Sequence, residues 1–253
     1  MRRIRLIAEY DGTNYVGWQI QPNGESVQGV IERELCSLTH EDIRIHGSGR
    51  TDSGVHSMAQ VLHFDTESRI PADKFPYALN VSLPHDIRIK YGDEPPAGFH
   101  SRFDVRKKHY RYTLYCAPHA SAFCAKTALH VHQKLDFEKM CKAASFILGE
   151  HDFAAFKSEG TELSSTVRTM YESQWTRDGK FMYYDICGSG FMYNMVRILV
   201  GTMLEIGKGY LDEDAMENAL KTCSRNAAGA TAPCHGLMMT RVEYDGFDTQ
   251  DYV

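Results

Sequence analysis

The 253-residue sequence has no long hydrophobic run, no pair of cysteines in a CxxC spacing and no excess of basic charge. A membrane-spanning helix needs about 18 consecutive apolar residues, so none is expected here. The first apolar run ends at Glu9, which makes it too short for the core of a signal peptide. The seven cysteines are an odd number and lie far apart, which is typical of reduced thiols and not of a disulfide framework. We therefore expect a cytoplasmic protein without a membrane segment.

Acidic residues outnumber basic ones by 33 to 28, and the formal net charge is −5. This balance does not favour nucleic acid as a partner, yet one basic face can bind phosphate while the remaining surface stays acidic. The distribution of charge along the chain is therefore more informative than its sum.

Strand and helix patterns are mixed along the chain. Ile4, Leu6, Ala8 and Tyr10 share one face of a predicted strand over 3–11, and Ser26 is placed to cap the helix that follows. Further strands are expected over 43–47, 59–66, 86–91, 109–116, 166–177, 180–187 and 237–244, and helices over 71–79, 135–148, 191–206 and from 211. This mixture predicts an α+β fold, not a doubly wound parallel sheet.

Two local signals refine this picture. Residues 92–98 contain two prolines and two glycines, which is typical of a linker. We therefore expect an N-terminal lobe over 1–98 and a C-terminal lobe over 99–253. Asp178-Gly179 favours a two-residue hairpin turn between the strands on either side.

The segment 45–56 places Arg50 and Asp52 among three glycines, two serines and a threonine. One interpretation is a flexible turn in which Asp52 bonds to its own backbone. The other is an active-site loop, since small residues let a substrate backbone come close. An arginine could then contact phosphate while the carboxylate faces the reacting atom. No lysine follows a glycine in this segment, so it is not a Walker A loop.

A second segment, 101–112, concentrates basic residues around the aromatic residues Phe103 and Tyr110. Its candidate contacts to RNA phosphate are Arg102, Lys107, Lys108 and Arg111. Phosphate contacts combined with stacking rings are what an RNA surface needs. The alternative is an exposed strand face with no ligand.

A third segment, 190–201, places Arg197 alone in an apolar stretch. A buried arginine needs a carboxylate partner, so Arg197 either reaches the surface or pairs with an active-site aspartate. No metal site is expected, because neither His130 and His132 nor the group around Cys116 completes a ligand set.

The three segments together resemble the TruA family of tRNA pseudouridine synthases. The likeness extends from residue 4 to about residue 245. It is carried by Glu9-Tyr10-Asp11-Gly12, Gly17-Trp18-Gln19, Ser26-Val27-Gln28, Gly49-Arg50-Thr51-Asp52-Ser53-Gly54-Val55-His56, Gln60-Val61-Leu62-His63-Phe64, Phe99-His100-Ser101-Arg102-Phe103, Tyr110-Arg111-Tyr112 and Asn194-Met195-Val196-Arg197.

This resemblance implies a cofactor-independent isomerase that converts uridine to pseudouridine at positions 38, 39 and 40 of the tRNA anticodon stem-loop. It also implies a homodimer with the pseudouridine synthase fold, whose two lobes flank a basic cleft. By motif position, Asp52 is the nucleophile and Arg50 assists flipping of the uridine. Tyr110 lies beside the base, Arg197 pairs with Asp52, and Leu237 helps to wall the pocket.

A carboxylate can add to C6 of uracil or to C1′ of ribose, and the sequence leaves both routes open. The chain departs from the usual family pattern at Ser53, at His109 and at Met238 near Cys234, where Met238 replaces a common aromatic residue. Two rival functions are an RNA-binding module that has lost its chemistry and an Asp-dependent phosphohydrolase. The second would need more carboxylates near Asp52 to hold a metal.

Overall fold

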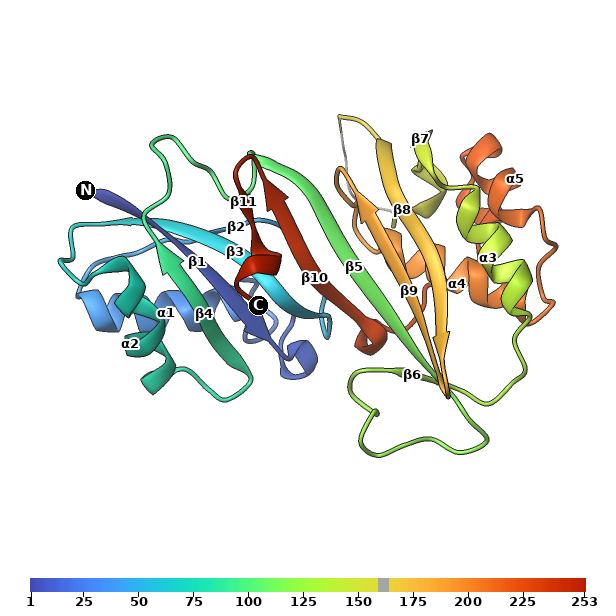
Figure 1. Ribbon diagram of the computed structural model, residues 1–253, viewed down its shortest axis with the longest axis horizontal. Helices are drawn as coiled ribbons and strands as arrows, with labels where there is room; N and C mark the ends of the chain where they lie inside the picture. Colours follow the sequence, from blue (N-terminus) through green and yellow to red (C-terminus); the bar gives the residue numbers. More distant parts are fainter. Residues whose placement is uncertain (159–163) are drawn as a thin grey trace. The chain divides into compact units, whose positions relative to one another are not determined.

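The computed structural model describes residues 1–158 and 164–253, which form two compact units (Figure 1). The first unit comprises Met1–Lys108 and Met238–Val253, and the second comprises His109–Leu237. The boundary expected after residue 98 differs from this division. Residues 99–108 pack with the first unit, where Arg3 donates to the Phe99 carbonyl at 2.6 Å and Tyr244 donates to the Ser101 carbonyl at 2.6 Å.

The first unit is built around a sheet. Its strands are β1 (Arg2–Tyr10), β2 (His46–Gly47), β3 (His56–Thr66), β4 (Ile87–Asp93), the beginning of β5 (Val105–Cys116), β10 (Leu237–Tyr244) and β11 (Phe247–Asp248). Strand β1 lies between β3 and β4 and is antiparallel to both, whereas β10 runs parallel to β3. The helices are α1 (Val27–Thr39) and α2 (Phe75–Ser82).

The face of β1 predicted from its alternation is confirmed. Ile4, Leu6, Ala8 and Tyr10 belong to the buried cluster that also contains the apolar side chains of α1 and α2. The opposite face is also buried, since Arg5 is only 5% exposed. Its guanidinium pairs with Asp93 at 2.5 and 2.9 Å, so the buried charge has a partner.

The helix cap predicted at Ser26 is also confirmed. The Ser26 hydroxyl accepts from the Gly29 backbone at 3.1 Å, which satisfies one of the orphan N–H groups at the start of α1. The next helix starts later than predicted, because residues 72–74 form a 3₁₀ turn and α2 begins at Phe75.

The second unit continues β5 and adds further strands and helices. The strands are β6 (Leu129–Val131), β7 (Gly149–Asp152), β8 (Val167–Asp178) and β9 (Phe181–Gly188). The helices are α3 (Phe137–Ser145), α4 (Met195–Gly207) and α5 (Ala215–Thr222). Strand β8 is antiparallel to β7 and β9, and the three helices group together in Figure 1. The mixture of strands and helices confirms the α+β class.

Several predicted boundaries differ in this unit. The helix expected over 135–148 spans Phe137–Ser145, and the helix expected from 211 begins at Ala215. Asp178 pairs with Phe181, so the hairpin loop is Gly179-Lys180 and not Asp178-Gly179. Gly179 has a φ of +55°, which a residue with a side chain rarely adopts. Helix α4 begins at Met195 and not at residue 191, because Asn194 has a φ of +60° and interrupts the helical backbone.

Among the described residues, no helix has both the length and the apolar content to cross a membrane.

Candidate active site

Asp52 lies in the loop between β2 and β3 of the first unit. Its side chain is half-buried, and its carbonyl accepts from the Val55 backbone at 3.1 Å. Gly54 has a φ of +74°, which the turn requires. The Asp52 loop, defined here as residues 48–55, is therefore a tight turn with a set backbone path. The turn is therefore ordered, while the assignment of the segment as an active-site loop stays a prediction.

Buried side chains hold the loop from below. The Ser48 hydroxyl donates to Gln60 Oε1 at 2.6 Å, and Gln60 Nε2 donates to the Gly49 carbonyl at 2.8 Å. Tyr10 and Thr51 share a hydroxyl–hydroxyl bond of 2.8 Å. Gln60 is fully buried. Polar groups buried in this way keep a single arrangement, because leaving one unpaired is unfavourable.

Residues 12–18 press against the same loop. A Cβ on Gly17 would lie 2.6 Å from the Thr51 carbonyl oxygen, and one on Gly12 would lie 2.1 Å from that of Val55. The Trp18 backbone also donates to the Thr51 carbonyl at 3.1 Å. The two glycines are needed for this close approach. These residues match motifs of the family, but no pattern in the sequence connects them to the loop.

The flipping residue predicted at Arg50 has an exposed side chain on this loop. Asp52 follows it by two residues, so the loop presents both groups from one rigid turn.

The predicted basic segment begins with an aromatic platform in the first unit. Phe103 is 75% exposed, and its ring lies 4.2 Å from that of His100. The His100 ring in turn lies 4.6 Å from that of buried His63. His100 Nδ1 accepts from the backbone of Arg102 at 3.1 Å, which fixes the turn. Arg102 is exposed, so a cation and a flat ring lie next to each other at the surface.

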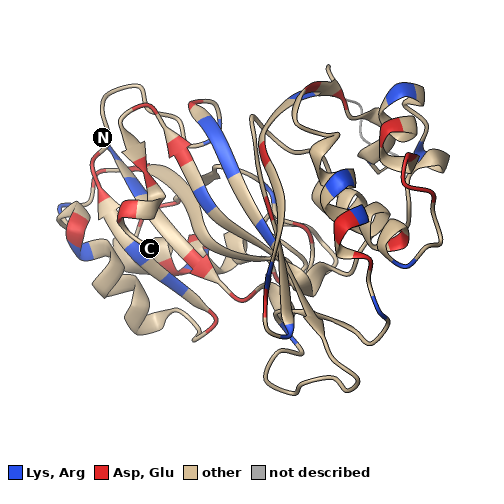
Figure 2. Ribbon diagram, turned by 45° about the vertical axis from the view of Figure 1, so that its right-hand side comes forward, with Lys and Arg blue, Asp and Glu red and all other residues tan. Residues whose placement is uncertain are grey.

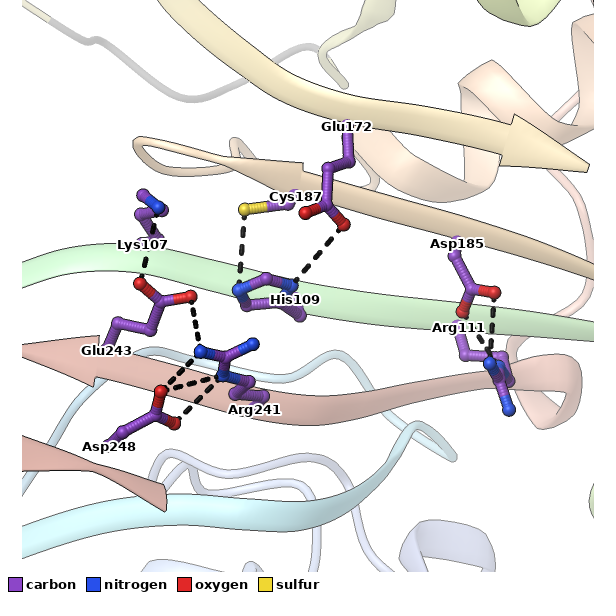
Figure 3. Close-up of polar contacts among 9 residues, drawn as sticks. All are labelled: Lys107, His109, Arg111, Glu172, Asp185, Cys187, Arg241, Glu243 and Asp248. Atoms are coloured by element: carbon purple, nitrogen blue, oxygen red, sulfur yellow. Dashed lines mark hydrogen bonds and ion pairs between the residues drawn. The ribbon is translucent and has the colours of Figure 1, made fainter. Parts of the chain in front are cut away.

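The lysines of this segment have different surroundings. Lys107 pairs with Glu243 at 3.3 Å (Figure 3), whereas Lys108 Nζ donates to the Ser48 carbonyl at 2.6 Å. Burial lowers the pKa of Lys108 to about 8, and Arg102 adds to this effect. Figure 2 shows that basic and acidic segments are interspersed along the strands, in keeping with such pairs.

In the second unit, Tyr110 lies on β5 and its ring is nearly buried. The ring meets that of Phe191 edge to face, with centroids 5.1 Å apart. This geometry is favourable for aromatic pairs and fixes the plane of the Tyr110 ring. The helix predicted over 191–206 would include Phe191, but this residue lies before α4 and packs on Tyr110 instead.

Arg197 is half-buried at the first turn of α4. Its Nη1 donates to Asn194 Oδ1 at 2.7 Å, and its Nε donates to the Ala232 carbonyl at 2.8 Å. A Cβ on Gly201 would lie 1.7 Å from the Ala230 carbonyl oxygen, so only glycine lets the 230–232 segment approach α4. The structure therefore places Arg197 in a defined orientation.

The remaining predicted residues of this unit also have set positions. Arg111 makes a two-pronged pair with Asp185 at 2.7 and 3.0 Å (Figure 3). His109, which replaces a more basic residue of the family pattern, contacts Cys187 Sγ at 3.4 Å. Leu237 is 4% exposed and opens β10. Cys234 is half-buried, as is Met238 of the first unit.

The structure thus brings Arg50 and Asp52 together in one unit and fixes Tyr110 and Arg197 in the other. The pairing of Asp52 with Arg197 would join the units and stays a prediction. Among residues 1–158 and 164–253, no group of three or more His, Cys, Asp or Glu could hold a metal ion.

Comparison with known proteins identifies the family. A family model described as tRNA pseudouridine synthase matches residues 6–104 and 143–245. The tRNA pseudouridine synthase A of Ruminiclostridium cellulolyticum is 46% identical over 245 residues, which cover 96% of this chain and all of that protein. The protein of the same name from Bacillus subtilis is 43% identical over 245 residues, covering 96% of this chain and 99% of that protein.

A solved Cbf5-Nop10-Gar1 complex aligns with 96% of this chain and 58% of its own at 10% identity, with a TM-score of 0.38. That superposition is too distant to bear on the site. The family model and the curated relatives confirm the resemblance seen in the sequence motifs. The chain belongs to the tRNA pseudouridine synthase family.

Proposed function

We propose that this enzyme isomerises uridine to pseudouridine at positions 38, 39 and 40 of the tRNA anticodon stem-loop, with Asp52 as the nucleophile. The main support for the proposal is the structure of the Asp52 loop. It presents one carboxylate beside one exposed arginine on a backbone fixed by buried side chains. Membership of the family adds the class of substrate and the class of reaction.

The reaction needs one nucleophile and no change of redox state. The Asp52 carboxylate adds to C6 of uracil or to C1′ of ribose, and the N1–C1′ bond breaks. The freed base rotates, C5 bonds to C1′, and the carboxylate leaves. The proton on C5 is lost and N1 gains a proton, so the product has the same composition as the substrate.

The other residues have roles around this step. The base must leave the helical stack, and the planar Arg50 guanidinium can fill the vacated space. Tyr110 offers a ring for stacking and a hydroxyl for proton transfer from C5. Arg197 keeps Asp52 ionised by pairing with it, and Leu237 walls the pocket.

Binding of the tRNA backbone is assigned to Arg102, Lys107 and Arg111. Arg111 and Lys107 are held by acidic side chains in the absence of RNA, so a phosphate would replace a carboxylate at each of them. The proposal includes the homodimer and the cytoplasmic location that the family resemblance implies. Light scattering on the purified protein tests the dimer.

The direct experiment measures tritium release from tRNA labelled at C5 of its uridines. A tRNA with uridines at positions 38 to 40 should release tritium, and the same tRNA with cytidines there should not. Equal release from both substrates would refute the assignment of these positions. Absence of release from either would refute the reaction.

A further inference from the structure

The ammonium group of Lys108 lies against the Asp52 loop. It donates to the Ser48 carbonyl at 2.6 Å, and a Cβ on the adjacent Gly49 would lie 2.9 Å from its nitrogen. The missing side chain of Gly49 is therefore what lets the ammonium group reach the loop. Lys108 belongs to a run of basic residues, yet its charge is directed at the backbone of the loop that carries Asp52.

Lys108 acts together with Gln60. The carbonyls of Ser48 and Gly49 are successive acceptors along the loop, and each takes a hydrogen bond from a side chain of another strand. Gln60 comes from β3 and Lys108 from β5, so the two donors clamp the loop from separate elements. Arg50 and Asp52 follow directly after the clamped carbonyls.

We infer that Lys108 and Gln60 are positioning residues for Asp52, and that Lys108 is not a contact to RNA phosphate. The inference rests on the proposed function, because it assigns the clamp to the loop of the nucleophile. A charged donor makes the stronger kind of hydrogen bond, and a nucleophile must be held closely to its productive geometry. The Lys108 nitrogen is already bonded to the Ser48 carbonyl, so its charge is directed at the loop and not at a polyanion.

The test compares Lys108→Met with the wild-type enzyme in three measurements. Loss of the clamp should lower kcat by about 10- to 100-fold, since small displacements of a reacting group have effects of this size. The Kd for tRNA should change by less than about twofold, and the slope of log Kd against log salt should be unchanged. Removal of a true phosphate contact would lower that slope by about 0.7 to 0.9. A lower slope, or an unchanged kcat, would overturn the inference.

Two further variants guard against a general loss of structure. Gly49→Ala keeps the lysine at position 108, but its new methyl group would push the Lys108 ammonium group away from the loop. The variant should therefore lower kcat with little change in thermal unfolding. Lys90→Met removes an exposed lysine that pairs with Glu9 at 3.3 Å on β1, and it should behave like the wild type. A Gly49→Ala enzyme with the wild-type kcat would contradict the clamp.

Failure of the inference can be told from failure of the proposed function. If the wild-type enzyme forms pseudouridine and Lys108→Met forms it at the same rate, only the clamp is wrong. If the wild-type enzyme forms none, the proposed function itself is wrong.

Discussion

Lys108→Met should change how the stability of the chain depends on pH. Burial lowers the pKa of this lysine from 10.5 to about 8 in the folded chain. Between these values the unfolded chain holds the proton and the folded chain has released it. Stability rises with pH wherever the unfolded state binds more protons. The buried ammonium group therefore disfavours folding at neutral pH, and this effect fades as the pH rises through 8 toward 10.5.

The size of the effect follows from the two pKa values. A tenfold change in proton affinity corresponds to about 1.4 kcal/mol, so the full effect is on the order of 3 kcal/mol. Only part of it appears in an accessible range, about 1 kcal/mol between pH 7 and pH 9. The Lys108→Met variant would lack this contribution at every pH, whereas the other titrating groups are common to both proteins.

Urea unfolding of both proteins at pH 7 and pH 9 measures the effect. The free energy of unfolding of the wild type, relative to Lys108→Met, should rise by about 1 kcal/mol between the two pH values. Parallel pH profiles would mean that the lysine is solvated in the folded chain.

Three other variants test separate parts of the structure. Gly201→Ala drives a methyl group into the Ala230 carbonyl and should lower the free energy of unfolding by about 1–3 kcal/mol or more, as urea titration would show; an unchanged midpoint would contradict the close approach. Tyr110→Phe keeps the ring but loses the hydroxyl, so kcat should fall by about 100- to 10,000-fold while tRNA binding is retained; a wild-type kcat would remove the hydroxyl from the reaction. Phe103→Ala should weaken tRNA binding by about 1–3 kcal/mol without lowering stability, because the ring is 75% exposed above His100; equal affinity would show that no base stacks there.

Much of the fold could be predicted where a local sequence pattern, such as alternation or a helix cap, matches the way the element packs in the folded chain. The alternation in β1 gave the correct buried face, and the Ser26 cap marked the start of α1. The start of α4 could not be predicted, since the apolar spacing continues back to Phe191 without a break. Asn194 has a left-handed backbone, and its side chain bonds to Ser158 and Arg197. Ser158 lies far away in the sequence, and the spacing of apolar residues gives no sign of either hydrogen bond.

For the candidate site as well, some residues could be predicted from the sequence and others could not. The residues around Asp52 left two interpretations open, and its role as the nucleophile came from the resemblance to the TruA family and stays a prediction. Lys108 was predicted as a contact to RNA phosphate, because a basic run does not show that one of its amines donates to the Ser48 carbonyl. Gln60 belonged to a segment that matched the family, but nothing in that segment linked its side chain to the Asp52 loop. Its partner, the Gly49 carbonyl, comes from a different element.

The central claim is that the carboxylate of Asp52 performs the chemistry. The most direct test is tritium release from C5-labelled tRNA by the wild-type enzyme and by Asp52→Asn, together with the Kd of each for the same tRNA. We expect release by the wild type, none by the variant, and affinities within a few-fold of each other. Release by Asp52→Asn at the wild-type rate would contradict the account.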